Sequence, residues 1–240
     1  FLSARGEKKT RQLFIISVSG GESIQITDVA SSVNRFDWSP DAMKIAFTMA
    51  DPETDDDKKR KKEKREWTIV DEDYKYNHLY VVSIEEIEEP RQLTKGDLNV
   101  GSFDWSPDGA KIVYDHTEIP TANSSSTSNI SIVGLASGSS RVIVDWGGFD
   151  ASPKFSNDGK RIAFVSDGDN PSWGREHYVY SASSSGVRKK KLQPTPSKYV
   201  NAIEGWSPDD SYIIVQEANK TSRRYFYVPS SVGGSVSAIT

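Results

Sequence analysis

The chain has no cysteine among its 240 residues, which excludes disulfide bonds, a thiolate nucleophile and any zinc site with cysteine ligands. It also lacks an apolar run of about 18 residues, the length that a membrane-spanning helix needs, so no membrane span is expected. The first residues do not show the charged and then apolar order of a signal peptide. Both a cytoplasmic and an exported location are compatible with this sequence.

An excess of basic residues is absent as well, because 30 Lys and Arg face 34 Asp and Glu, for a net charge of −4. Proteins that bind nucleic acid non-specifically rely on a basic surface that displaces counterions from the phosphates. Nucleic acid is therefore not the expected partner.

The motifs of acyl hydrolases are missing too: there is no Gly-x-Ser-x-Gly nucleophile elbow, no His-Gly-Gly-Gly loop and no alternating strand and helix pattern. No catalytic residue and no cofactor is predicted within these residues. The three histidines, His78, His116 and His177, give no characteristic metal-ligand spacing. His78 and His177 fall near the start of predicted strands and are best explained as strand residues.

A repeated motif is the most informative feature. "FDWSPDAMKIAF" from Phe36 returns as "FDWSPDGAKIVY" from Phe103, and in weaker form as "PKFSNDGKRIAF" from Pro153 and "IEGWSPDDSYIIV" from Ile203. Each copy reads as a strand, a tight turn in which proline presets φ and glycine accepts positive φ, and a second strand. The residues that define the repeat are Trp38, Pro40, Asp41, Trp105, Pro107, Asp108, Phe155, Asp158, Trp206, Pro208 and Asp209.

Two further strands are expected after each copy, for example "HLYVVSI" from His78 and "PRQLT" from Pro90. Four strands per unit, with repeats every 50 or 51 residues in the later copies, predict an all-β β-propeller of four-stranded blades. About four and a half blades of a seven- or eight-bladed ring are expected, because this number does not obviously close a ring. The predicted segments are a half blade 1–32, a blade 33–96, and blades 97–147, 148–196 and 197–240.

The first blade carries an insertion from Asp51 to Asn77, in which acidic residues precede a mostly basic run from Lys58 to Arg65. This order suits a short helix with acids near its N-terminus and bases near its C-terminus. A solvated helix is the simpler interpretation. A docking element for another domain or for an anionic partner is the alternative.

The motifs together resemble a known family. "FDWSPDGAKIVY", "IVDEDYKYNHLYVVSIEEIEEPRQLT" and "KRIAFVSDGDNPSWG" resemble the β-propeller of prolyl oligopeptidase family serine peptidases, closest to the acylaminoacyl peptidase and dipeptidyl peptidase branch. The Trp-Ser-Pro-Asp-Gly motif is shared with TolB-like propellers. The Asp-Trp-x-Tyr-Glu-Glu context by which dipeptidyl peptidase IV relatives hold a substrate amine is not found.

The resemblance implies a propeller that gates peptide access to an α/β-hydrolase domain lying outside these residues, so the partners would be that domain and a short peptide. Long connections between second and third strands would share one face, the face on which function is expected. The candidates for contact with the peptide or the catalytic domain are Trp67, Tyr74, Trp173 and Arg175. A TolB-like scaffold for protein–protein interaction is the alternative, a propeller lyase with metal ligands is a third option, and an oligomer is compatible with all three.

Overall fold

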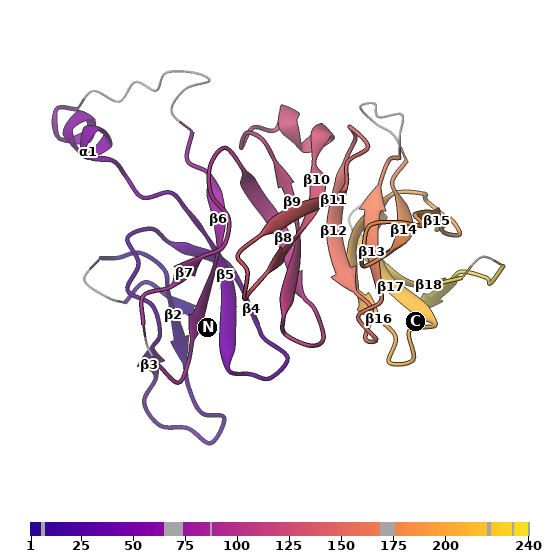
Figure 1. Cartoon of the computed structure of the whole chain (residues 1–240), viewed down its shortest axis with the longest axis horizontal. Helices are drawn as coiled ribbons and strands as arrows, with labels where there is room; N and C mark the ends of the chain where they lie inside the picture. The colour runs from indigo at the N-terminus through magenta and orange to yellow at the C-terminus, as the bar shows by residue number, and fades with distance from the viewer. Residues whose placement is uncertain are drawn as a thin grey trace. The chain divides into compact units, whose positions relative to one another are not determined.

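The computed structural model describes residues 1–5, 8–64, 74–86, 88–168, 176–219, 222–231 and 233–239. The chain forms two compact units, Phe1–Asn99 and Val100–Thr240. Both are built of antiparallel sheets in which strands that follow one another in the sequence are neighbours (Figure 1). The all-β prediction is therefore confirmed.

The first unit contains two sheets and the only α-helix among the described residues. A three-stranded sheet consists of β1 (Leu2–Ser3), β2 (Gln12–Ile15) and β3 (Ile24–Gln25). A four-stranded sheet consists of β4 (Val33–Trp38), β5 (Lys44–Ala50), β6 (Asn77–Ser83) and β7 (Arg91–Gln92), with α1 (Asp55–Lys62) between β5 and β6. Leu13, Ile26, Val33, Phe47 and Val82 belong to one buried cluster that joins the two sheets.

The second unit contains three four-stranded sheets. The first has β8 (Asn99–Trp105), β9 (Lys111–Thr117), β10 (Asn129–Gly134) and β11 (Ser140–Val144), with the short 3-10 helix η1 (Asn123–Thr127) before β10. The second has β12 (Asp150–Phe155), β13 (Arg161–Ser166), β14 (Tyr178–Ser183) and β15 (Lys190–Lys191). The third has β16 (Val200–Trp206), β17 (Tyr212–Asn219), β18 (Ser222–Pro229) and β19 (Ser237–Ile239).

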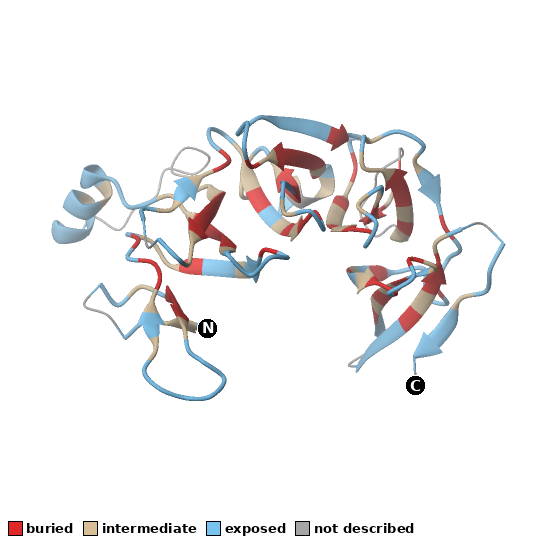
Figure 2. Cartoon of the chain, turned by 60° about the horizontal axis from the view of Figure 1, so that its bottom comes forward, coloured by how far each residue is buried: buried red, intermediate tan, exposed pale blue. Residues whose placement is uncertain are grey.

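The second strand of the repeat is deeply buried in three of the sheets. The middle residues of β5, β9 and β13 are buried without alternation, and Figure 2 shows the buried residues of the chain in red. Strands covered on both faces are expected to be continuously apolar, as "KIAF" and "RIAF" are. The repeat therefore encodes a second strand whose residues are buried on both faces of its sheet.

The tight turn of the repeat has one geometry in all four copies. Its serine carbonyl accepts a hydrogen bond from the amide three residues later, as in Gly109 N to Ser106 O at 2.8 Å. The serine hydroxyl donates to the aspartate two residues on, over 2.6 Å from Ser106 to Asp108, and this bond is the main reason that the pKa of Asp108 is lowered. The fourth turn residue has positive φ in each copy: Ala42 (57°), Gly109 (67°), Gly159 (69°) and Asp210 (57°).

The aromatic residue of the repeat is buried in three copies and exposed in one. Trp105, Phe155 and Trp206 are at most 9% exposed, whereas Trp38 is 40% exposed. The sheet that precedes Trp38 has strands of only two to four residues and offers little surface to cover an indole ring. The copies are thus alike in turn geometry and different in burial.

Candidate functional site

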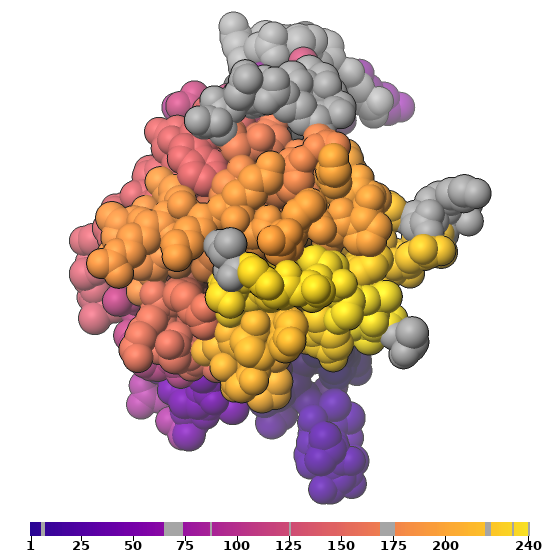
Figure 3. All heavy atoms as spheres, turned by 90° about the vertical axis from the view of Figure 1, so that its right-hand side faces the viewer, coloured from indigo at the N-terminus to yellow at the C-terminus, as the bar shows by residue number. Residues whose placement is uncertain are grey.

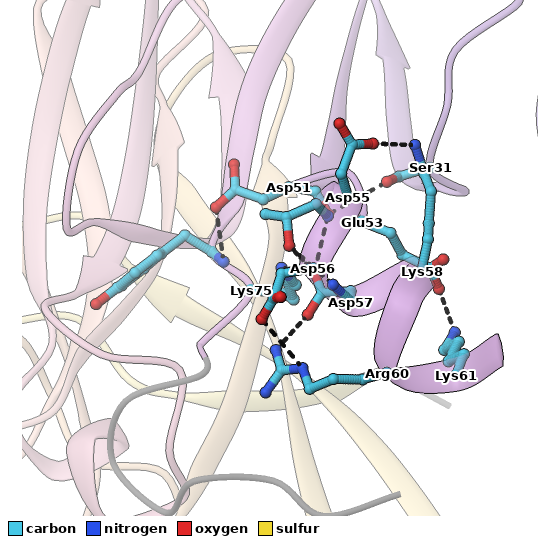
Figure 4. Close-up of polar contacts among 12 residues, drawn as sticks. Ser31, Asp51, Glu53, Asp55, Asp56, Asp57, Lys58, Arg60, Lys61 and Lys75 are labelled. Carbon is cyan, nitrogen blue, oxygen red and sulfur yellow. Dashed lines mark hydrogen bonds and ion pairs between the residues drawn. The ribbon is translucent and has the colours of Figure 1, made fainter. Parts of the chain in front are cut away.

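The connection between β5 and β6 leaves the sheet through a closed base. The Asp51 amide donates to the Tyr76 carbonyl at 2.8 Å, and the Tyr76 amide donates back to Asp51 Oδ2 at 3.1 Å. The Ser31 hydroxyl also donates to the Asp51 carbonyl, at 3.3 Å (Figure 4). These bonds hold the two ends of the insertion together where it leaves the sheet.

His78 lies directly under this base and is 3% exposed. Its Nε2 is 3.6 Å from Asp51 Oδ1, and its Nδ1 is 3.3 Å from the Thr94 hydroxyl. Burial lowers the pKa of His78, and the nearby Asp51 carboxylate opposes this only in part. The imidazole is therefore mainly neutral at pH 7, when it can make a hydrogen bond but carries no charge.

Helix α1 begins with a capping box. The Thr54 hydroxyl accepts from the Asp57 amide at 3.1 Å, and the Asp57 carboxylate accepts from the Thr54 amide at 2.7 Å. Acids occupy its first turn and bases its last, which is the order that the helix dipole favours. The predicted helix is therefore present, over Asp55–Lys62, and none of its residues is buried.

Asp57 connects this helix to the chain that returns toward β6 (Figure 4). Its carboxylate accepts from Lys75 Nζ at 2.6 Å and from Arg60 at 2.7 Å, in addition to the cap. The Lys75 hydrogen bond is the largest cause, followed by those from Thr54, of a pKa for Asp57 well below its usual range. Lys75 thus ties the far end of the insertion to the start of α1.

Of the four residues predicted to contact peptide or catalytic domain, the described part of the chain includes one. Tyr74 is half-buried, and its ring packs edge-on against Tyr76 with the ring centroids 6.2 Å apart. Trp67, Trp173 and Arg175 lie outside the described residues. Their grouping with Tyr74 stays a prediction.

Asp115, at the end of β9, joins two sheets of the second unit. Its carboxylate accepts from the Ser102 amide at 3.1 Å, from the Ser102 hydroxyl, and from the Ser152 amide of β12 at 2.9 Å. A Cβ at position 101 would lie 2.1 Å from Asp115 Oδ1, so a larger residue in place of Gly101 would displace this carboxylate. A carboxylate satisfied in this way is a structural group rather than a free acid or base.

Asp150, in β12, is a fully buried carboxyl group. Burial is the main reason that its pKa is raised to about 7. The Ser166 hydroxyl and the Trp146 amide lie near enough to the carboxyl group to lower its pKa in part. Neither carboxylate oxygen, however, makes a hydrogen bond of normal geometry to the described residues. The group takes up a proton near neutral pH, and its backbone amide donates to the Ser128 hydroxyl at 3.0 Å.

His177 is sandwiched between two aromatic rings. Its centroid lies 4.6 Å from that of Phe149 and 4.6 Å from that of Tyr199, and both pairs are stacked. Burial lowers the pKa of His177, and the nearby Asp167 carboxylate raises it by a smaller amount. His116 is also buried, with a lowered pKa, and its Nε2 lies 2.8 Å from the Ser131 hydroxyl. No group of three potential metal ligands occurs among the described residues.

Comparisons with known proteins place these sheets in context. No family model matches the chain. Over 120 residues it is 36% identical to dipeptidyl-peptidase 5 of Porphyromonas gingivalis. This match covers 48% of this chain and 17% of that protein. The matched part of the chain thus spans about a sixth of the length of this curated relative.

Solved structures share the fold at low sequence identity. A TolB-like protein from Agrobacterium tumefaciens matches with a TM-score of 0.65 and 18% identity, over 95% of this chain and 73% of that one. A puromycin-hydrolyzing peptidase from Mycobacterium tuberculosis matches with a TM-score of 0.64 and 12% identity, over 92% of this chain and 35% of that one. The chain is built of β-propeller blades.

The predicted resemblance to the propellers of prolyl oligopeptidase family peptidases and of TolB is therefore confirmed. No helix among the described residues is long and apolar enough to cross a membrane. The blade boundaries and the total number of blades stay predictions.

On the side of the tight turns, the propeller blades of the second unit are joined by charged contacts. Asp104 accepts from Lys154 Nζ and from the Phe155 amide, both at 2.8 Å. Asp210 accepts from the Asn157 amide at 2.8 Å and from the Asp158 amide at 3.0 Å. The Arg161 guanidinium lies 4.7 Å from the Trp206 ring centroid and donates to the Asp210 carbonyl at 3.0 Å.

Several of these residues were not singled out from the sequence. Asp104 precedes the repeated Trp of its own repeat copy, and Asp210 stands where two copies have glycine, so each has a weak indication in the sequence. Asp150 carried none, because an aspartate next to a predicted strand gives no indication that it is fully buried.

Proposed function

We propose that this chain is the non-catalytic propeller part of a longer serine peptidase of the prolyl oligopeptidase family, in which it limits the access of peptides to a separate hydrolase domain. The observation that carries the proposal is the 36% identity with dipeptidyl-peptidase 5 over 120 residues, together with the 17% of that protein that is covered. The nucleophile, its base and its acid would lie in the remainder.

Sheet packing supports a gating role. A propeller can exclude folded proteins only if its blades keep a fixed spacing while an extended peptide passes. In the second unit, neighbouring blades share buried apolar clusters and the charged hydrogen bonds of Asp104, Asp115 and Asp210. Charge-assisted bonds of this kind are stronger and shorter than neutral ones and resist sliding of one blade on another.

The insertion between β5 and β6 is the proposed contact with the hydrolase domain. Its helix is held at its N-terminal end by the cap at Thr54 and by the bond from Lys75 to Asp57, and none of its residues is buried. We assign Tyr74, Trp67, Trp173 and Arg175 to the surface that meets the hydrolase domain or the peptide. The alternative, a solvated helix with no docking role, would not require the Asp57–Lys75 bond.

A TolB-like scaffold is the second candidate. It is favoured by the match to the Agrobacterium protein, which covers 95% of this chain and 73% of the other. In that case the irregular connections would recruit another protein and no hydrolase domain would be needed.

A serine-directed probe separates the two candidates. The longer protein that contains this chain is treated with a fluorophosphonate and its intact mass is measured, with the 240-residue chain as the matched control. We expect one adduct on the longer protein and none on the 26.6 kDa chain. A longer protein that stays unlabelled while it cleaves no peptide would contradict the peptidase proposal and favour the scaffold.

A further inference from the structure

An aromatic stack crosses the second unit where three of its strands begin. The His177 ring lies between the rings of Phe149 and Tyr199, with centroid distances of 4.6 Å on both sides and interplanar angles of 18° and 24°. Phe149 directly precedes β12, His177 precedes β14 and Tyr199 precedes β16. The stack therefore joins the second and third sheets of this unit, which Figure 3 shows at the surface in orange and yellow.

The inner end of the stack is anchored in the hydrophobic core. Phe149 is half-buried and packs against the buried cluster that contains Val200 and Trp206. Its amide donates to Asp167 Oδ1 at 2.9 Å, so its backbone is fixed as well. The Phe149 ring thus gives a rigid support to the imidazole of His177.

The outer end of the stack is exposed but held in place. Tyr199 is 42% exposed although one face of its ring packs on His177. The Val200 amide donates to the His177 carbonyl at 3.2 Å, and a parallel bridge links His177 to Tyr199. The residues that precede both rings also pair, because Lys198 Nζ lies 3.2 Å from Glu176 Oε1. These contacts present the remaining surface of the Tyr199 ring to solvent in a fixed orientation.

An exposed ring held in this way suits a ligand with a second ring. Stacked rings attract each other beyond the area that they bury, and a ring already held in place loses little conformational freedom on binding. The charges beside Tyr199 satisfy each other, since Glu176 pairs with Lys198 and also accepts from the Tyr178 hydroxyl. Such a pair offers little attraction to a phosphate or a carboxylate. An uncharged aromatic ring is therefore favoured over a nucleotide or an acidic group.

We propose that Tyr199 forms a subsite that binds an aromatic side chain of the peptide by stacking, with His177 and Phe149 as the residues that position its ring. The inference rests on the proposed function, because it takes the ligand to be a peptide on its way to the hydrolase domain. It adds the chemical class of that substrate, which is a peptide that contains phenylalanine, tyrosine or tryptophan.

Binding of short blocked peptides to the 240-residue chain tests the subsite. N-acetyl-Gly-Phe-Gly-amide and N-acetyl-Gly-Leu-Gly-amide are titrated with the chain, and their affinities are measured from the NMR shifts of the peptide protons. We expect the phenylalanine peptide to bind about three- to tenfold more tightly than the leucine peptide. Its ring protons should also move upfield, which is the signature of stacking on an aromatic face.

Substitutions of the exposed ring show whether Tyr199 determines this preference. Tyr199→Phe keeps the ring and should keep both the preference and the upfield shift. Tyr199→Leu keeps an apolar side chain without a ring and should lose both. Tyr212→Leu is the matched control, because Tyr212 is 41% exposed at the start of β17 and its removal should leave the preference unchanged.

Substitutions of His177 separate positioning from simple exposure. His177→Ala removes the support of the Tyr199 ring and should abolish most of the preference although Tyr199 is still present. His177→Phe restores a stacked ring and should restore the preference. A purely structural role of His177 would instead lower the melting midpoint of the chain without changing the ratio of the two affinities.

Three results would overturn the inference. The first is equal affinity of the wild-type chain for the two peptides. The second is a preference for the phenylalanine peptide that survives in Tyr199→Leu. The third is a preference that disappears in Tyr212→Leu, which would mean that the peptide ring binds elsewhere.

The two proposals can fail separately. If the longer protein is labelled by the fluorophosphonate but the chain does not prefer the phenylalanine peptide, the subsite is refuted and the peptidase proposal stands. If the chain prefers the phenylalanine peptide through Tyr199 but the longer protein has no labelled serine, the ring-binding site stands and the peptidase proposal fails.

Discussion

Asp210 and Asn157 form a matched pair across two neighbouring propeller blades. The Asp210 carboxylate accepts from both the backbone amide and the side-chain amide of Asn157, at 2.8 and 2.7 Å. The other three copies of the repeat have proline at the position of Asn157 and lack this donor. The copy that has asparagine in place of proline is therefore followed by the copy that has a carboxylate in the facing turn.

This pairing predicts a compensating double substitution. Asp210→Gly should lower the free energy of unfolding by about 1–2 kcal/mol, because charge-assisted bonds are lost while glycine accepts the positive φ. Asn157→Pro alone should cost more, since it leaves a carboxylate that is 8% exposed without its main donors. In the preceding pair of facing turns Gly159 lies against the ring of Pro107. The double variant recreates this contact and should recover about 1 kcal/mol or more of the free energy of unfolding, measured in urea. Strictly additive effects would refute the pairing.

The unequal burial of the repeat tryptophans predicts unequal costs of removing them. Trp105→Ala should lower the free energy of unfolding by about 3–5 kcal/mol, because the ring is 6% exposed in its sheet. Trp38→Ala should cost about 1 kcal/mol, because that ring is 40% exposed. Similar midpoints in urea for the two variants would show that position in the repeat, and not burial, sets the cost.

Asp150 predicts a loss of stability as the pH rises. Its folded-state pKa of about 7 lies above the ordinary value of 3.8, so between these values the folded chain holds a proton that the unfolded chain has released. The contribution of protonated Asp150 to the free energy of unfolding is intact below about pH 4. It is lost as the pH rises through 7, by a few kcal/mol in total.

The Asp150 effect is measured as a difference between variants. His78, His116 and His177 have lowered pKa values and act in the opposite direction, destabilising the fold as the pH falls below 6.5. The unfolding free energy of Asp150→Asn minus that of the wild type should therefore grow from pH 4 to pH 8. A difference that is constant across this range would mean that Asp150 titrates normally.

Asp57 predicts how the insertion responds to trypsin. Asp57→Asn removes the charge that holds Lys75 and Arg60, so cleavage after the lysines of α1 should accelerate severalfold. Asp55→Asn is the matched control, since the Asp55 side chain is fully exposed and, among the described residues, pairs only with Lys58. Because the pKa of Asp57 is depressed, wild-type protection should persist above the ordinary pKa of 3.8 and be lost only as the pH falls below it. Equal rates for the two variants would contradict the role of Asp57.

Local features of this fold could be predicted from the sequence, and contacts between sheets could not. The tight turns, the strands that flank them and the charged helix each follow from a few adjacent residues, such as Ser106, Asp108 and Gly109. The Asp210–Asn157 contact joins residues 53 positions apart and depends on how closely two turns approach. The burial of Asp150 and the exposure of Trp38 depend on which neighbouring sheet covers them.

The candidate site was less predictable than the fold. The sequence predicts a role for Tyr74 because it lies in a long connection, and the structure places it against Tyr76. The groups that organise that connection, Asp51, Asp57 and Lys75, appeared in the sequence only as members of a charged run. Charge order predicted the helix, but the partner of each charge depends on the path of the chain back to β6.

Peptide length provides the most direct test of the gating role. The kcat/KM values of the longer protein are measured on a short peptide and on an unfolded polypeptide of about 30 residues, for the wild type and for Asp210→Gly. If the propeller limits access, loosening this contact between blades should raise kcat/KM for the long substrate and leave the value for the short peptide unchanged. An unchanged ratio of the two values, in a variant whose β16 amides exchange hydrogen faster than in the wild type, would contradict the gating role.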